Sequence, residues 1–206
     1  MRLAPHKHQD YRFPMKPLSI STLTICGIDE LPAQSGRTVT HVLSILDPNW
    51  PELEAFQAYG THHRTTLNFH DIIDADEGKI LPLPQHVAEI LNFGKALAES
   101  KADGAEGHLL IHCHMGISRS TAAMLSLLAQ TYPDESEARL FERLRQIRPQ
   151  AWPNSLMIQY ADDLLGRNGK LVDELRRHYG WQIKREPNYL EWMARIGRSR
   201  ELDMAV

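Results

Sequence analysis

The sequence predicts a single α/β domain with a central, mostly parallel sheet of about four to five strands, flanked by helices and followed by a helical C-terminal part. Short apolar runs of strand length alternate with longer stretches in which apolar residues recur at helical spacing. This order is typical of parallel strands joined by helices. The length of 206 residues and the hydrophobic content of 42% suit one globular domain.

The first half of the chain contains three predicted strands. Residues 18–26 alternate apolar and polar side chains, as a half-buried strand does. Residues 27–36 predict a turn or short helix, and residues 40–46 predict a second strand. Residues 51–59 predict a helix with a proline in its first turn, and residues 65–69 predict a short third strand.

The middle of the chain predicts a helix, a buried strand and a second helix. The helix over residues 84–99 follows from apolar positions at helical spacing, which are Val87, Ile90, Leu91, Phe93 and Leu97. Residues 108–113 are apolar enough for a central strand, and residues 121–129 predict a helix that is buried on most sides.

The rest of the chain is predicted to be helical. Helices are expected over residues 134–147, 154–165 and 170–179, with Asp134 as the N-cap of the first. We divide the chain into a loose N-terminal extension (1–17), a folded domain (18–180) and a helical, aromatic C-terminal extension (181–206). The aromatic side chains of the last part are expected to pack back onto the domain, namely those of Trp181, Tyr189 and Trp192.

Composition narrows the classes of partner. A net charge of −3 without a recognisable nucleic-acid-binding module argues against nucleic acid, and no apolar stretch reaches the roughly 18 residues that span a bilayer. Only two cysteines occur, so we expect no disulfide framework and a reducing, cytoplasmic setting, with Cys26 in the core. The oligomeric state stays open.

Basic side chains are concentrated after residue 138. Four of them surround the predicted helix 134–147, namely Arg139, Arg143, Arg145 and Arg148. A solvated helix face explains them adequately, and the alternative is that they attract an anionic substrate.

One motif carries the chemistry. Between the buried strand and the following helix, the chain reads His112-Cys113-His114-Met115-Gly116-Ile117-Ser118-Arg119-Ser120. A loop that leads from a strand into a helix amino terminus gathers backbone N–H groups and favours an anion. Helix N-termini and nearby cations also favour a cysteine thiolate. The pattern therefore predicts a phosphate-binding loop that holds a nucleophilic cysteine.

The motif resembles the signature of the cysteine-dependent protein tyrosine phosphatase superfamily, and looks most like its compact dual-specificity and bacterial branches. The resemblance covers approximately residues 18–165. It implies a phosphatase that acts on phosphomonoesters, above all phosphotyrosine and also phosphoserine or phosphothreonine in proteins, without a metal or other cofactor. The partner is then a phosphorylated protein or a small phosphomonoester, without a membrane or nucleic acid.

The resemblance also implies roles for residues of the motif. Cys113 would form a phosphocysteine, Arg119 would hold two phosphoryl oxygens in its planar fork, and Ser120 would donate a hydrogen bond to the sulfur. His112 would orient the loop. The substrate-binding residues would be those of the loop itself, which are His114, Met115, Gly116, Ile117, Ser118 and Arg119.

A general acid is expected in the loop after an earlier strand, by the same resemblance. Residues 71–77 offer four carboxylates, and we choose Asp71 because it lies just beyond the predicted strand 65–69. That strand should end at the sheet edge where Cys113 lies. Asp74 is the alternative, in a loop that could fold back. Pro153-Asn154 is a candidate counterpart of a Pro-Asn pair found in many relatives.

Two other functions compete with this interpretation. The first is a phosphate-binding module that keeps the loop but lacks efficient turnover. The second is a metal phosphohydrolase, suggested by His70-Asp71 and by the eleven histidines. Such a site needs several ligands gathered around the metal, whereas His70-Asp71 follows a predicted strand.

Overall fold

The computed structural model describes residues 20–99 and 107–206, and the expected extension over residues 1–17 lies outside them. Four strands form one sheet in the order β1-β4-β2-β3, and every neighbouring pair is parallel. The strands are β1 (Ile20–Cys26), β2 (His41–Leu46), β3 (His63–Asn68) and β4 (Gly107–His112). The predicted parallel sheet flanked by helices is confirmed, with four strands.

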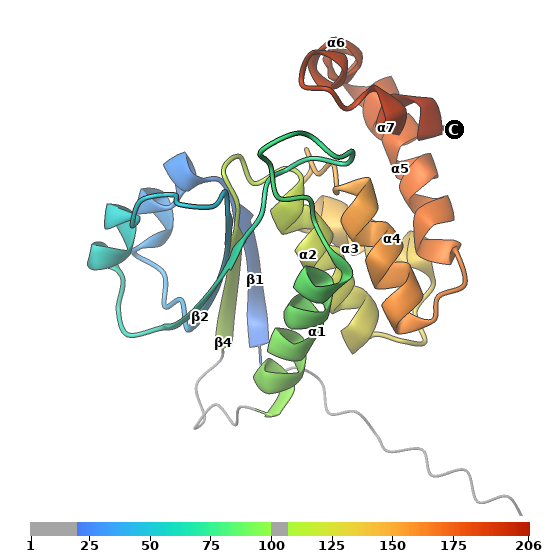
Figure 1. The fold of residues 1–206 in the computed structure, drawn as a ribbon. Helices are drawn as coiled ribbons and strands as arrows, with labels where there is room; N and C mark the ends of the chain where they lie inside the picture. Colours follow the sequence, from blue (N-terminus) through green and yellow to red (C-terminus); the bar gives the residue numbers. More distant parts are fainter. Residues whose placement is uncertain (1–19, 100–106) are drawn as a thin grey trace, which may run out of the picture.

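Helices gather on one side of the sheet (Figure 1). They enclose the larger apolar core, to which the buried side chains of β1, β4 and the first helices contribute. These helices are α1 (Pro84–Glu99), α2 (Arg119–Thr131), α3 (Glu137–Ile147), α4 (Ser155–Leu165) and α5 (Lys170–Arg185). None of the helices in the described ranges is both long and apolar enough to cross a membrane.

The opposite face of the sheet carries a smaller apolar core under short 3₁₀ helices (Figure 1). These are Ile28–Glu30, Pro32–Gln34 and Glu54–Ala58. The predicted helix over residues 51–59 is therefore wrong in type and in length. A single 3₁₀ segment is enough there to bury Phe56 against the sheet, so no longer amphipathic face is needed.

The carboxyl ends of β1, β4 and β2 lie together at one edge of the sheet. All six residues of β4 are buried, because the strand lies between β1 and β2. The register pairs His112 with both Cys26 and Ser44. Two short C-terminal helices, α6 (Asn188–Arg195) and α7 (Ser199–Met204), lie at this same end, as Figure 1 shows.

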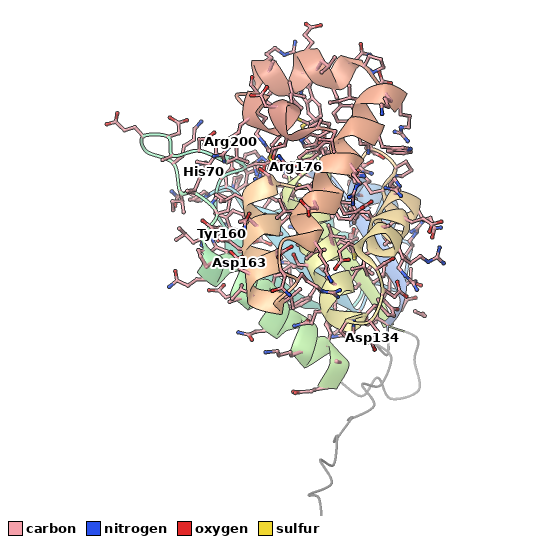
Figure 2. The ribbon with its side chains drawn as sticks, turned by 90° about the vertical axis from the view of Figure 1, so that its right-hand side faces the viewer. His70, Asp134, Tyr160, Asp163, Arg176 and Arg200 are labelled. Atoms are coloured by element: carbon pink, nitrogen blue, oxygen red, sulfur yellow. The ribbon has the colours of Figure 1, made fainter. Side chains whose placement is uncertain are left out.

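Two helix boundaries differ from the prediction. Helix α3 begins at Glu137, and its N-cap is Ser136, whose side chain accepts from the Arg139 N–H, so Asp134 is not the cap. Asp134 lies in the preceding turn, at the end of the molecule far from His70 (Figure 2). Helix α5 continues to Arg185, past the predicted end at residue 179, so the expected domain boundary falls inside it.

The C-terminal part packs through stacked aromatic rings. Trp152 is fully buried, and its ring centroid lies 4.3 Å from that of Tyr179 and 5.0 Å from that of Tyr189. Tyr189 therefore packs back onto the domain, as expected. Trp181 stays more exposed, and the guanidinium groups of Arg145 and Arg185 lie against its ring.

Candidate active site

The loop from Cys113 to Ser118 joins β4 to α2 and we call it the cradle loop. Cys113 lies at its start and is 2% exposed. Its Sγ is 3.2 Å from the Oγ of Ser120 in the first turn of α2. The sulfur thus faces the amino terminus of a helix, where the backbone dipole favours negative charge.

Four carbonyl groups of the cradle loop accept hydrogen bonds from neighbouring segments. The carbonyl of His114 accepts from the Ile28 N–H, and that of Ile117 accepts from the Trp152 N–H. The carbonyls of Met115 and Gly116 both accept from Arg148. In a trans peptide the N–H points away from the carbonyl, so the N–H groups of the four following residues, 115–118, face the opposite side. Such a row of N–H groups is an anion-binding nest.

Arg148 is fixed as a brace for this loop. Its Nη1 and Nη2 donate to the two carboxylate oxygens of Glu30 at 2.9 and 2.8 Å. Glu30 Oε2 in turn accepts from the Gly27 N–H at 2.6 Å. A bidentate arginine–carboxylate pair has a defined geometry, so the remaining Nε is aimed at the Gly116 carbonyl, 2.9 Å away.

Gly116 is required by both conformation and space. Its φ of +69° is in the left-handed region that side chains disfavour. A Cβ at this position would stand 2.4 Å from the carbonyl carbon of Cys26. The cradle loop therefore packs directly on the end of β1, and a larger residue would push it away.

Arg119 lines the cavity and carries one unpaired donor. Its Nη1 donates to Asp47 Oδ1 at 2.7 Å and also to the Phe69 carbonyl. Its Nε is buried and has no partner among the described residues. Buried N–H groups normally have a partner. The guanidinium is thus anchored at one nitrogen and keeps donor capacity for a ligand.

Asp71 lies just past β3 and is held by three donors. Its Oδ1 accepts from Ser118 Oγ at 2.7 Å, from Asn154 Nδ2 at 3.0 Å and from Arg198 Nη1 at 3.0 Å. Burial acts to raise the pKa of Asp71, but the charges of Arg198 and then Arg119 outweigh it and lower this pKa. The carboxylate is therefore ionised in the unliganded protein.

These groups surround one cavity of about 280 Å³. Cys113 lines it from the cradle loop, Arg119 from α2, and Asp71 from the loop after β3. An apolar wall comes from α6 and the turn that follows. The other lining residues are Asp47, His70, Ile72, Lys79, His114, Met115, Ile117, Ser118, Trp192, Met193, Ile196 and Arg198.

Two histidines of the motif have lowered pKa values. His112 is completely buried with Nε2 2.6 Å from Ser44 Oγ, and burial lowers its pKa to about 4. His114 stacks against Trp50 at 4.1 Å between ring centroids, and burial followed by the charge of Arg119 lowers its pKa. The positive charge near the sulfur therefore comes from arginine rather than from imidazolium.

The predicted residues are largely brought together. Cys113, Arg119, Asp71 and all the proposed loop residues except Gly116 line the cavity, while Gly116 shapes the loop. Asp74 does not line it and pairs with Arg200, and Figure 2 shows Arg200 beside the loop that carries His70.

The basic helix face does not line the cavity. Arg139 and Arg143 pair with Glu142 and Glu135, and Arg145 lies over Trp181. Only Arg148 reaches the cradle loop, and it does so as a brace.

Sequence reasoning missed three contributors to the site. Asp47 directly follows β2 at the same sheet edge as Cys113, and this position is a signal that the sequence carries. Arg198 and the α6 side chains of the apolar wall belong to no recognisable sequence motif. They come from the far end of the chain and are found only through the fold. No group of three or more His, Cys, Asp or Glu side chains suited to a metal occurs in residues 20–99 and 107–206.

Comparisons with known proteins agree with this geometry. A model of the protein-tyrosine phosphatase family matches residues 77–163. Human protein phosphatase Slingshot homolog 3 is 32% identical over 149 residues, which are 71% of this chain and 19% of that protein. Mouse dual specificity protein phosphatase 15 is 28% identical over 151 residues, which are 72% of this chain and 57% of that protein. The chain thus spans less than two thirds of either relative.

Solved structures share the fold at low identity. Human tyrosine phosphatase-like serine/threonine/tyrosine-interacting protein has a TM-score of 0.52 at 16% identity, covering 73% of this chain and 95% of that one. A mouse putative dual specificity phosphatase has a TM-score of 0.51 at 18% identity, covering 79% and 96%. At these identities the likeness is one of fold.

The chain is similar to the cysteine-dependent protein tyrosine phosphatase superfamily, and to its dual-specificity members in particular. The match of the family model includes the cradle loop. It begins after Asp71 and ends before α5, so Asp71 and Arg198 lie outside it.

Proposed function

We propose that the protein hydrolyses phosphomonoesters through a phosphocysteine formed on Cys113. The single observation that carries the proposal is that Cys113 lines one cavity with Arg119, whose buried Nε has no partner among the described residues. A phosphoryl group in that cavity would give Nε its missing acceptor. Its other oxygens would meet the N–H groups of residues 115–118.

The chemistry divides into two transfers. In the first, the Cys113 thiolate attacks phosphorus, the bond to the leaving oxygen breaks, and Asp71 donates a proton to that oxygen. In the second, a water molecule attacks the phosphocysteine, Asp71 takes a proton from the water, and the P–S bond breaks. Ser120 donates a hydrogen bond to the departing sulfur. Splitting one hard displacement in this way is the gain from covalent catalysis.

The general acid must be protonated when the substrate is bound, whereas Asp71 is ionised without it. A phosphoryl dianion in the cavity resolves this, because negative charge nearby favours the protonated carboxyl. The dianion also takes part of the charge of Arg119, one of the two cations that lower the pKa of Asp71. Substrate binding therefore supplies the proton affinity that the free site lacks.

Phosphorylated proteins are the proposed substrates, with phosphotyrosine first and phosphoserine or phosphothreonine also accepted. The apolar wall favours an aryl group, since Ile117 faces the cavity from the loop and Met193 and Ile196 face it from the C-terminal segment. The two curated relatives are named as a protein phosphatase and a dual specificity protein phosphatase. We place the protein in the cytoplasm, because both of its cysteines are free thiols.

Turnover of p-nitrophenyl phosphate by Cys113→Ser tests the proposal. This variant should lose turnover and still bind inorganic phosphate in titration calorimetry, because Arg119 and the loop remain. Cys26→Ala is the matched control. Burial raises the pKa of Cys26 to about 12, so this thiol stays protonated and its loss should leave turnover in place.

Arg119→Lys completes the test, since lysine keeps the charge but loses the planar fork. It should lose most of the turnover. Wild-type turnover in Cys113→Ser would contradict the phosphocysteine. Phosphate binding without turnover in the unsubstituted protein would instead identify a phosphate-binding module. Loss of turnover on adding a chelator would favour a metal phosphohydrolase.

A further inference from the structure

The C-terminal segment after α5 contributes a charged side chain to the cavity. Arg198 lies between α6 and α7, lines the cavity, and is 2% exposed. Its backbone N–H donates to the Met193 carbonyl at 2.8 Å, which fixes where the side chain starts. The residue lies 35 positions beyond the last one that the family model matches, 198 − 163.

Glu201 sets the direction of the Arg198 guanidinium. Nε donates to Glu201 Oε2 at 2.9 Å and Nη2 donates to Oε1 at 2.7 Å. Glu201 is completely buried, and its two oxygens also accept from Trp152 Nε1 at 2.7 Å and from the Ser155 N–H at 2.8 Å. A planar fork held at two nitrogens has no freedom left at the third.

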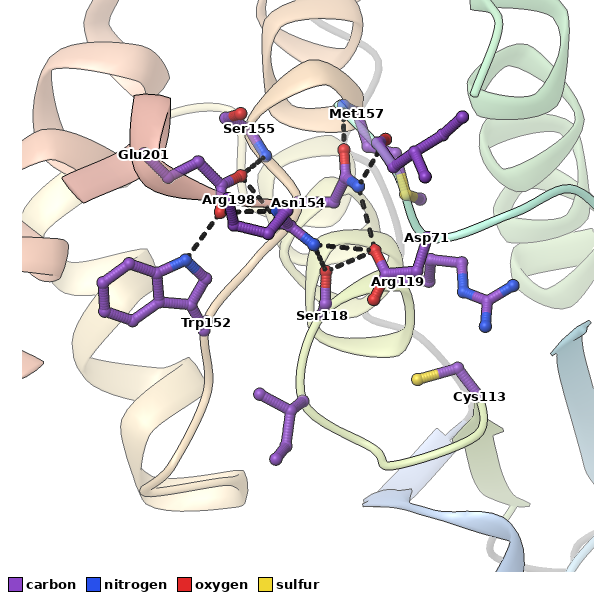
Figure 3. Close-up of polar contacts among 12 residues, drawn as sticks. Asp71, Cys113, Ser118, Arg119, Trp152, Asn154, Ser155, Met157, Arg198 and Glu201 are labelled. Atoms are coloured by element: carbon purple, nitrogen blue, oxygen red, sulfur yellow. Dashed lines mark hydrogen bonds and ion pairs between the residues drawn. The ribbon is translucent and has the colours of Figure 1, made fainter. Parts of the chain in front are cut away.

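That third nitrogen points at the candidate acid. Arg198 Nη1 donates to Asp71 Oδ1 at 3.0 Å and lies 3.1 Å from Ser118 Oγ. Figure 3 shows the chain of contacts from Trp152 through Glu201 and Arg198 to Asp71, above the Cys113 sulfur.

We propose that Arg198 is a positioning residue, which holds the Asp71 carboxyl over the cradle loop and makes the C-terminal segment a working part of the active site. The inference rests on the proposed function. It adds a residue that acts on the reaction through Asp71.

A purely structural role explains the arrangement less well. Glu201 alone balances the charge of Arg198, and a buried ion pair adds little net stability over apolar packing. Asp71 needs no buried partner, because its side chain is 31% exposed and water could solvate it. The contact therefore matters for where the carboxyl stands. The contact also lowers the proton affinity of Asp71, since the charge of Arg198 lowers the pKa of Asp71 against the effect of burial.

Several charged or titratable groups surround Asp71 in the described structure, and Asp47, His70, Lys79 and Cys113 line the same cavity. Arg198 comes from the α6–α7 turn and Arg119 from α2, while His114 comes from the cradle loop and Tyr179 from α5. Removing Arg198 takes away the larger of the two arginine charges that lower the pKa of Asp71 and leaves that of Arg119. The pKa of Asp71 should then rise, and the fall of kcat/KM on the alkaline side should begin at higher pH.

The experiment compares four proteins on two substrates. The proteins are the unsubstituted chain, Arg198→Gln, Asp71→Asn and the double variant. Phenyl phosphate has a leaving group that needs a proton, and p-nitrophenyl phosphate needs it less. Arg198→Gln should lose about 10-fold or more in kcat on phenyl phosphate and much less on p-nitrophenyl phosphate. In the Asp71→Asn background the same change should cost little.

Inorganic phosphate should inhibit Arg198→Gln as well as it inhibits the unsubstituted protein. Arg177→Gln, in an exposed arginine of α5 that pairs with Glu174, is the matched control and should change nothing. Equal losses on both substrates, additive with Asp71→Asn, would overturn the proposal, as would an unshifted alkaline limb.

Folding is monitored by thermal melting, because Arg198→Gln leaves Glu201 buried without its ion pair. The variant Arg198→Gln with Glu201→Gln removes both charges and is measured in the same way. If both variants fail to fold, Arg198 serves the fold and the proposal fails. If the unsubstituted protein shows no Cys113-dependent turnover, the proposed function itself fails and this inference falls with it.

Discussion

Arg119 Nη1 donates to Asp47 Oδ1 at 2.7 Å, and this ion pair lines the same cavity as the Cys113 sulfur. Asp47 directly follows β2 and Arg119 begins α2, so the pair ties the end of one strand to the helix that follows another. Because Nη1 is held by Asp47, the buried Nε keeps its donor for a ligand.

Asp47→Asn should therefore impair the positioning of the Arg119 guanidinium and leave proton transfer to the leaving group unaffected. We expect kcat/KM to fall by up to about 10²-fold, by the same factor for phenyl and p-nitrophenyl phosphate. The control is Asp163→Asn, which changes an exposed aspartate of α4 (Figure 2) and should leave kcat/KM unchanged. A loss confined to phenyl phosphate would show that Asp47 is the acid.

Asp71→Asn should show the leaving-group dependence that Asp47→Asn lacks. A positioned acid contributes about 10²–10⁴-fold, so kcat on phenyl phosphate should fall by that order, with a smaller loss on p-nitrophenyl phosphate. The alkaline limb of the pH profile should also disappear. Asp74→Asn should behave like the unsubstituted protein, since Asp74 pairs with Arg200 outside the cavity. The reverse pattern would move the acid to Asp74.

Arg148→Ala should loosen the cradle loop. The variant loses the donors to the Met115 and Gly116 carbonyls and the pair with Glu30. Hydrogen bonds to charged groups contribute about 1.5–3 kcal/mol, so chemical denaturation should show a loss of about 2 kcal/mol, together with weaker phosphate binding. Arg139→Ala breaks an exposed pair with Glu142 and should alter neither. Unchanged phosphate binding in Arg148→Ala would mean that the loop keeps its shape unaided.

Stability should decline between pH 6.5 and about 4. Burial lowers the pKa of His178 and of His112 to about 4. Between these pH values the two histidines therefore bind protons in the unfolded chain and stay neutral in the folded protein. The histidine contribution is fully present above pH 6.5 and is lost as the pH falls. His178→Gln should reduce the slope of the unfolding free energy by up to about 1.4 kcal/mol per pH unit, measured by urea denaturation. An unchanged slope in His178→Gln would contradict a buried neutral ring.

Elements with a strong periodic pattern could be predicted from the sequence. The helix predicted over residues 84–99 has those bounds in the structure, because its apolar stripe is long and unambiguous. Residues 51–59 have one buried anchor, Phe56, which a 3₁₀ turn buries as well as an α-helix does. Asp134 and Ser136 are both good N-caps, and only the backbone path decides between them.

The site was predictable as far as its residues are close in sequence. The motif from His112 to Ser120 contains the cradle loop, and Asp71 could be chosen because parallel strands end at one sheet edge. Arg198 and Asp71 are 127 positions apart, and Arg198 lies in a polar segment without a pattern. A contact of that kind depends on how α6 and α7 dock, which no local pattern encodes.

Mass spectrometry of the acid-quenched reaction tests the central claim most directly. Ser120→Ala removes the Oγ that lies 3.2 Å from the Cys113 sulfur, so hydrolysis of the phosphoenzyme should slow and the intermediate should accumulate with p-nitrophenyl phosphate. We predict one added phosphoryl group on the peptide that contains Cys113, and none on that peptide in Cys113→Ser. Turnover that proceeds while no phosphoryl group is ever found on Cys113 would contradict the account.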